Sequence, residues 1–133
     1  MYVEKRKHKR LKIKLDAKIE SENNIVIEGK TRNMSFGGLF FELKILTGDR
    51  LNKGTICTVT IMLNTDDMKN HIPLVFQCKL VHIHKKGYGL RYICIEGLEA
   101  YEHFEKMMVL NSDDPEGLMG ELETRPGLIV KND

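Results

Sequence analysis

Alternation of apolar and charged residues limits how this chain can fold more than any other feature of its sequence. From residue 11 to residue 20, every odd position is apolar and every even position is charged. The same period of two recurs at 57–63 and 74–80, and further β-prone stretches occupy 25–27, 39–41 and 88–93. Successive side chains of a strand point to opposite faces, so the pattern predicts six strands, the first beginning at Leu11. Connections by turns rather than long crossovers favour an antiparallel barrel or a sandwich.

The segment between the second and third predicted strands has a different character. Residues 30–38 read KTRNMSFGG, which is too polar and too rich in glycine for an ordinary strand interior. We therefore expect these residues to connect two strands rather than to belong to one.

The period changes to that of a helix towards the C-terminus. Apolar residues recur at helical spacing, with glutamates between them, at Leu98, Tyr101, Phe104 and Met108. They predict an amphipathic helix over about 96–110 that packs on the strands. Asp114 followed by Pro115 is typical of a capped helix start, so a second short helix to about residue 123 is expected, with an extended stretch at 127–130.

Composition and charge bound the class of protein. The chain has 133 residues, of which 41% are apolar, enough for one compact domain with its own core. Residues 1–18 hold eight lysine and arginine side chains against two acidic ones, a charge of +6, although the whole chain carries only +2. This asymmetry indicates either an anionic partner near the N-terminus or lysines that are merely solvated.

Targeting signals and cysteines indicate the compartment. No apolar run approaches the roughly 20 residues that a bilayer-spanning helix needs, and no hydrophobic segment follows the basic N-terminus. The three cysteines, Cys57, Cys78 and Cys94, are odd in number and far apart, as expected for reduced thiols. We expect a cytoplasmic protein that does not insert into membranes.

Two arginines stand out within the basic N-terminal segment. Arg6 and Arg10 lie four residues apart, just before the first predicted strand. A guanidinium group is a planar fork of donors that can hold a phosphate, or the O6/N7 edge of guanine, with two hydrogen bonds. The alternative is a solvated basic arm, because any basic stretch contains such a spacing by chance.

A second candidate motif is the stretch NMSFGG, residues 33–38. Asn33 and Ser35 are two apart and would present an amide and a hydroxyl to the same side of an extended backbone. The pair Gly37 and Gly38 permits positive φ, close approach of a ligand and backbone N–H groups that face an anion. The alternative is a structural turn in which Asn and Ser bond to their own backbone.

Together, the two motifs resemble those of the PilZ domain, the bacterial receptor module for cyclic di-GMP. The family pattern is RxxxR before a strand, followed after one hairpin by [Asp/Asn]xSxxG; the chain has RKHKR and NMSFGG. Gly89-Leu90-Arg91-Tyr92 also resembles the Gly-x-x-aromatic pattern of the family's last strand. The resemblance covers about residues 4–108 and leaves the tail from Val109 uncovered.

The resemblance implies a fold and a division of the chain. The expected fold is all-β, a six-stranded antiparallel barrel of the PilZ type with one or two α-helices after it. Residues 1–10 would form a flexible arm, residues 11–110 the barrel and helix, and residues 111–133 a C-terminal extension. The apolar residues of this extension would cover the barrel's open side, form a homodimer contact or dock a partner.

The resemblance also implies a function and a set of ligand contacts. The arm would close on cyclic di-GMP and thereby alter a surface for an effector protein. Arg6 and Arg10 would hold guanine edges and phosphates, while Asn33, Ser35 and Gly38 would contact a guanine and the sugar–phosphate rim. The family often has Asp at the position of Asn33; Asn offers one carbonyl acceptor in place of a carboxylate, so we expect an effect on affinity rather than on binding itself.

Other functions were weighed against this one. A PilZ-like adaptor that does not bind nucleotide is the main alternative, and the intact motifs argue against it. A barrel that binds single-stranded nucleic acid needs aromatic residues across a basic face, whereas the aromatics here follow the core phases. His82 and His84 share a strand face without a further ligand nearby, so no metal site is expected. Ser35 has no base at motif spacing, and we predict a protein that is not an enzyme and has no cofactor.

Overall fold

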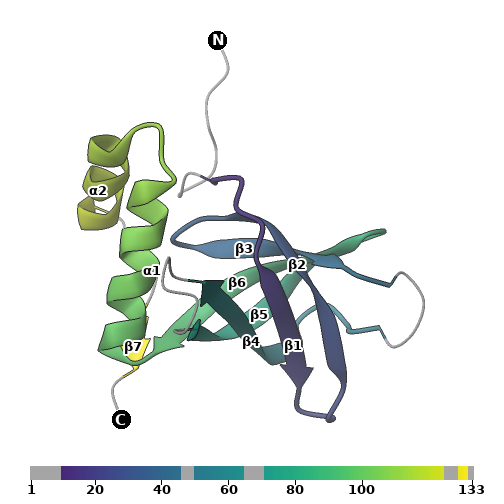
Figure 1. Cartoon of the computed structure of the whole chain (residues 1–133). Helices are drawn as coiled ribbons and strands as arrows, with labels where there is room; N and C mark the ends of the chain where they lie inside the picture. The colour runs from purple at the N-terminus through teal and green to yellow at the C-terminus, as the bar shows by residue number, and fades with distance from the viewer. Residues whose placement is uncertain (1–9, 46–49, 65–70, 125–128, 132–133) are drawn as a thin grey trace.

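Six antiparallel strands close into a barrel in the computed structural model, which describes residues 10–45, 50–64, 71–124 and 129–131 (Figure 1). The strands are β1 (Asp16–Ser21), β2 (Val26–Met34), β3 (Gly38–Leu43), β4 (Ile56–Asn64), β5 (His71–His84) and β6 (Gly87–Glu96). Their order in the sheet is β3-β2-β1-β4-β5-β6, and a further pairing of β3 with β6 closes the barrel. The predicted six-stranded antiparallel barrel is confirmed.

Two helices and a short strand follow the barrel. They are α1 (Leu98–Leu110), α2 (Pro115–Thr124) and β7 (Ile129–Lys131). The carboxylate of Asp114 accepts the Gly117 N–H at 3.1 Å, so the predicted cap of the second helix is confirmed. The periodicity did not predict that β7 would pair in parallel with the end of β6. Neither helix has the length and apolar content needed to cross a membrane.

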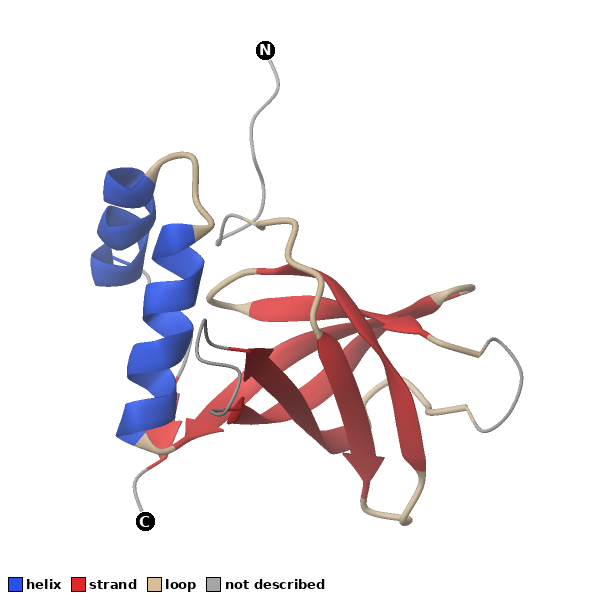
Figure 2. Ribbon diagram, viewed as in Figure 1, coloured by secondary structure: helices blue, strands red, loops and turns tan. Residues whose placement is uncertain are grey.

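Helix α1 stands against one end of the barrel (Figure 2). Its Phe104 is completely buried and meets three barrel-side rings edge to face: Phe36 at 5.6 Å, Phe76 at 5.2 Å and Tyr92 at 5.8 Å between ring centroids. Edge-to-face aromatic contacts add about 0.5–1.5 kcal/mol each beyond simple burial. Phe104 therefore fixes the helix to the barrel and to the residues that follow β2.

The C-terminal extension packs on the domain where the structure describes it. Helix α2 contacts α1, and its Leu118 is 1% exposed. Val130 of β7 is half-buried against the core. Leu118 and Val130 are thus used within the chain, where they pack with the core.

The first strand begins later than the alternation predicted. Residues 11–20 keep alternating between buried and exposed, but β1 starts at Asp16, and Leu11 forms only an isolated bridge with Met34. The reason is Thr31, whose hydroxyl donates to the Ile13 carbonyl at 2.6 Å and accepts the Leu15 N–H at 2.9 Å. A buried side chain thus takes the place of part of the strand-to-strand hydrogen bonding here, while the Thr31 N–H still donates to the Leu15 carbonyl at 2.9 Å.

The expectation of a connection over residues 30–38 was wrong for its first half. Strand β2 runs through this polar stretch to Met34, with a bulge between Thr31 and Asn33. The two polar side chains directly before Asn33 have hydrogen-bond partners: Thr31 bonds to backbone, and the Arg32 Nε donates to Glu42 at 2.9 Å. Specific partners make this polar strand stable, and a count of polar residues cannot reveal them.

Candidate functional site

The three residues of the second predicted motif lie on one turn at the rim of the barrel. Strand β2 ends one residue before Ser35, and β3 begins at Gly38. We call residues 33–38 the motif turn. Phe36 at its centre is fully buried against Phe104 of α1. The turn is therefore held at the end of the barrel that the helix covers.

The basic N-terminal segment is joined to this turn by its backbone. Leu11 and Met34 exchange two hydrogen bonds, Leu11 N–H to Met34 O at 2.8 Å and Met34 N–H to Leu11 O at 2.9 Å. Arg10 directly precedes Leu11, so it enters the fold beside the motif turn. Arg6, the other predicted arginine, lies outside the described residues. Of the five predicted site residues, the structure brings four to one rim.

Ser35 uses its hydroxyl inside the turn. The oxygen accepts the N–H groups of Gly37 and Gly38, both at 3.1 Å, and donates to the Gly38 carbonyl at 3.2 Å. A serine hydroxyl has one donor and two acceptor sites, so its bonding capacity is filled. The self-bonded turn, which the sequence left open as an alternative, describes Ser35 here; contact with a ligand stays a prediction.

Gly38 is required for close strand packing rather than for an unusual backbone. Neither Gly37 nor Gly38 has a positive φ, so the conformational freedom that the pair permits is not used here. A Cβ on Gly38 would lie 2.1 Å from the Leu90 carbonyl oxygen, because β3 and β6 pair closely where they close the barrel. The Gly37 carbonyl accepts the Tyr92 N–H at 3.0 Å. Both glycines thus anchor the motif turn to β6.

Asn33 is the motif residue whose bonding is incomplete. Its Oδ1 is buried and has no hydrogen-bond partner among the residues that the structure describes. A buried acceptor without a donor costs roughly 1–3 kcal/mol, and native proteins contain few of them. The Asn33 amide is therefore the group at this rim that stands to gain most from a new donor.

Strand pairing extends the site across four strands. Asn33 pairs with Phe40, Phe40 with Gly89, and Gly89 with His82, and we call these four residues the outer row. Gly89 has no side chain, and a Cβ there would lie 3.0 Å from the His82 Cβ. The His82 side chain lies against Gly89, which is buried, and Phe40 is buried too, so the exposed imidazole of His82 is the accessible ring of the row.

Planar groups surround the centre of this row. Phe40 lies on the outer face of the barrel yet is only 5% exposed, because the Arg32 guanidinium lies 4.3 Å from its ring centroid and the His84 ring 5.1 Å away. The His82 and His84 rings are 6.3 Å apart. The sequence had linked these histidines to each other but not to Asn33. The histidines are linked to Asn33 only by the register of β2, β3, β6 and β5, and a single sequence does not reveal register.

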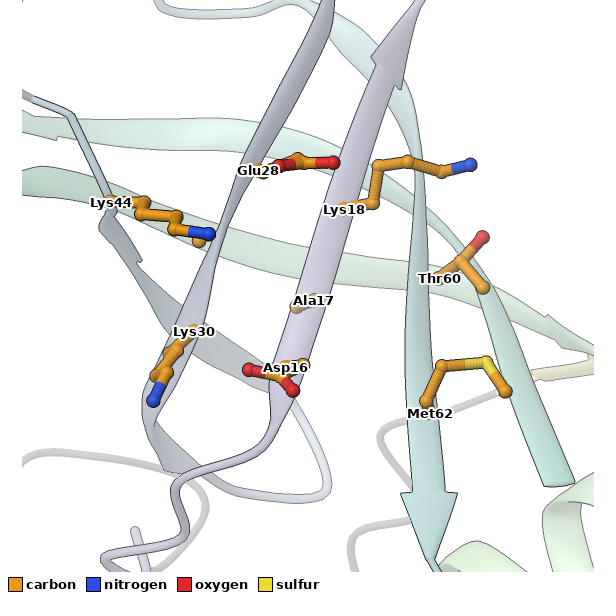
Figure 3. A pocket seen from close by; sticks show the side chains of 9 residues that line it. Asp16, Ala17, Lys18, Glu28, Lys30, Lys44, Thr60 and Met62 are labelled. Atoms are coloured by element: carbon orange, nitrogen blue, oxygen red, sulfur yellow. The ribbon is translucent and has the colours of Figure 1, made fainter. Parts of the chain in front are cut away.

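A different hollow, of about 410 Å³, lies on the outer face of β2, β1 and β4 (Figure 3). Two of its three lysines have acidic neighbours: Lys18 pairs with Glu28 in register and bonds to Glu20 at 2.9 Å, and Lys30 pairs with Asp16. Most of the positive charge is thus offset by carboxylates, so this face is a poor site for a dianion. It contains none of the predicted ligand residues.

The described chain contains two deeply buried thiols and no cluster of metal ligands. No group of three or more His, Cys, Asp or Glu side chains gathers there to hold a metal ion. Burial raises the pKa of the Cys57 thiol to about 11, and burial also raises the pKa of Cys78 well above its ordinary value. Both thiols remain protonated at neutral pH and are weak nucleophiles.

A comparison with protein families shows which family the chain belongs to. The model of the PilZ domain matches residues 4–105, which include both motifs and the whole barrel. The chain belongs to the PilZ domain family. A comparison with curated proteins gives no significant match.

Solved PilZ structures share the fold at low sequence identity. The Bacillus subtilis inhibitor of motility MotI/DgrA superimposes with a TM-score of 0.63 at 19% identity over 84% of this chain, which spans only 54% of that protein. The PilZ domain of CeSA from a cellulose-synthesizing bacterium gives 0.58 at 14% identity, covering 78% of this chain and 99% of that one. The PilZ domain of Escherichia coli YcgR, solved with c-di-GMP, gives 0.58 at 12% identity, covering 92% and 98%.

Proposed function

We propose that this protein is a cytoplasmic receptor for cyclic di-GMP, with a binding rather than a catalytic role. The observation that carries the proposal is the pair of hydrogen bonds between Leu11 and Met34, which joins the root of the RxxxR segment to the motif turn. Membership of the PilZ family and the c-di-GMP bound to the PilZ domain of YcgR support the same ligand.

Each predicted residue receives a role that matches its surroundings. The Asn33 Oδ1 accepts an N–H of guanine, which supplies the donor that this buried oxygen lacks. Arg6 and Arg10 hold phosphates or guanine edges with their forked donors. Ser35 and Gly38 shape the turn that presents Asn33, and a direct contact from Ser35 requires the hydroxyl to give up a bond within the turn.

In this proposal the second guanine of the ligand binds along the outer row. Neighbouring strands lie about 4.8 Å apart, so Asn33 and His82, three strands apart, are separated by about 14 Å along the curved surface. The His82 side chain covers the buried Gly89, and its exposed ring offers a stacking surface. We assign the first guanine to Asn33 and the second to the His82 end of the row.

Binding is coupled to the rest of the domain through Phe36. This residue follows Ser35 in the motif turn, and its ring lies against Phe104 of α1 at an interplanar angle of 83°. A ligand that moves the turn therefore moves the contact with α1. In the proposed mechanism residues 1–10 form an arm that closes on cyclic di-GMP, and the altered surface changes the affinity of residues 11–110 for an effector protein.

A calorimetric titration tests the proposal. Cyclic di-GMP should bind, whereas GTP and cyclic di-AMP should bind at least tenfold more weakly, because one lacks the second base and the other lacks the guanine N1–H and N2–H donors. No heat with cyclic di-GMP would instead support the second candidate, an adaptor that does not bind nucleotide. The complete bonding of the Ser35 hydroxyl within the turn is the observation that keeps this candidate open.

A further inference from the structure

A groove separate from the outer row lies between the N-terminal segment and α1. It measures about 620 Å³ and runs between residues 12–15 on one side and the second half of α1 on the other. We call it the lysine groove; the residues used below are Lys12, Lys14, Leu63, Lys106, Met107 and Leu110. Leu110 is 74% exposed, the highest exposed fraction among the large hydrophobic residues of the described chain.

The groove combines an apolar floor with a positively charged rim. Leu63, Met107 and Leu110 supply the apolar surface, and the exposed Lys12, Lys14 and Lys106 supply the charge. None of the described residues that line the groove is acidic. This distinguishes it from the hollow in Figure 3, where each of two lysines pairs with an acid in register.

We propose that the lysine groove docks an acidic amphipathic segment of the effector protein. An amphipathic helix places apolar anchors in a groove and charges along its edges, which matches both surfaces described above. Residues 1–9 of the chain itself are a poor occupant, since they carry four basic side chains and one acidic one. Helix α2 of a second copy is acidic, but its Leu118 is already buried in its own chain.

This inference deepens the proposed function, because one wall of the groove continues the ligand-binding segment. Arg10 and Lys12 flank Leu11, which is bonded to Met34 at the motif turn. An arginine drawn to cyclic di-GMP therefore shifts the lysines that face α1. Ligand binding and partner docking share residues 10–15 without sharing their contact atoms.

The test uses the full chain and a labelled 18-residue helical peptide with leucines on one face and glutamates on the other. Lys106→Glu and Leu110→Glu should each weaken peptide binding, measured by fluorescence anisotropy, by about tenfold. Matched controls are Lys79→Glu and Val26→Glu, which alter an exposed lysine and a 57% exposed valine away from the groove. They should bind as the wild type does. Amide NMR shifts caused by the peptide should map to Leu63, Lys106 and Leu110.

Several results would overturn the inference. They are failure of the acidic peptide to bind, equal binding by a peptide of the same composition with shuffled order, and groove variants that bind like the controls. Binding to phosphatidylglycerol vesicles without peptide binding would show that the groove binds a membrane rather than a partner segment. Self-association abolished by Leu110→Glu would show that it binds a second copy.

A cyclic di-GMP titration of Leu110→Glu separates the two proposals. Lost peptide affinity with retained nucleotide affinity supports the groove, and absent nucleotide binding in every variant rejects only the proposal that the protein is a receptor.

Discussion

Two outer faces of the same barrel differ in how their polar groups are satisfied. On the face of β2, β1 and β4, Lys18 has Glu20 and Glu28 as neighbours, so its charge is balanced within the sheet (Figure 3). On the face of β2, β3, β6 and β5, Asn33 carries a buried oxygen without a partner among the described residues, and His82 presents an exposed ring. The first face has its lysine charge largely offset by carboxylates, whereas the second offers an acceptor for a donor such as a guanine N–H.

The largest expected effect concerns the residue that ties the N-terminal segment to the second face. Thr31→Val keeps the shape of the side chain but leaves the Ile13 carbonyl and the Leu15 N–H without their partner. Each unpaired buried group costs roughly 1–3 kcal/mol, so we expect the free energy of unfolding to fall by about 2–4 kcal/mol in chemical denaturation. Thr60→Val on the balanced face should change it by less than about 0.5 kcal/mol. Equal losses for both variants would remove the special role of Thr31.

The next effect is on the ligand. Arg10→Ala should weaken cyclic di-GMP binding by at least about 2 kcal/mol, roughly thirtyfold, because a charged hydrogen-bond partner is lost from a desolvated contact. We expect the same of Arg6→Ala. The control is Lys18→Ala, which removes a cation from the balanced face and should leave the affinity unchanged in calorimetry. A Lys18 variant that binds as weakly as the Arg10 variant would show that only general positive charge matters.

A smaller effect is expected at the far end of the outer row. His82→Ala should cost about 1 kcal/mol of binding, since stacking on one base contributes roughly 1–3 kcal/mol. His82→Phe keeps a ring and should retain most of the affinity. Met62→Ala, on the opposite face, serves as the matched truncation. If the phenylalanine variant binds as poorly as the alanine variant, stacking is not the contribution of this position.

The smallest expected effect on stability is that of Asn33→Ala, which should weaken ligand binding without lowering the free energy of unfolding. Asn33→Ala removes a buried acceptor that has no donor in the described chain, so the free energy of unfolding should stay level or rise by up to about 1 kcal/mol. Binding of cyclic di-GMP should fall, because the guanine loses its acceptor. Thermal unfolding and titration of the same sample give both values. A clear loss of stability would mean that Asn33 is a structural residue.

The sequence predicted which residues face the core better than it predicted which groups bond to each other. Alternation gave the buried face of residues 11–20, but the hydroxyl of Thr31, eleven residues beyond that stretch, decides where β1 begins. The polarity of residues 30–33 argued against a strand, because polarity alone does not show that Arg32 bonds to Glu42 and packs on Phe40 across the sheet.

The candidate site was predictable as two motifs and not as one surface. Spacing picked out Arg10, Asn33, Ser35 and Gly38, which meet at one rim, while Arg6 lies outside the described residues. The close approach of Gly38 to Leu90 depends on a tertiary contact that no local pattern contains, whereas the bonding of Ser35 within its own turn was an alternative that the sequence left open. His82 was linked to the site only by strand register, which depends on one bulge in β2 and two register shifts between β5 and β6.

The most direct test of the account is a set of backbone amide NMR spectra recorded as cyclic di-GMP is added. We expect the largest shifts at Leu11, at residues 33–38 and at Gly89, and almost none at Lys18, Glu28 or Thr60 on the balanced face. Shifts centred on the β2, β1 and β4 face, or an unchanged spectrum at saturating ligand, would contradict the assignment of the binding site to the motif turn and the outer row.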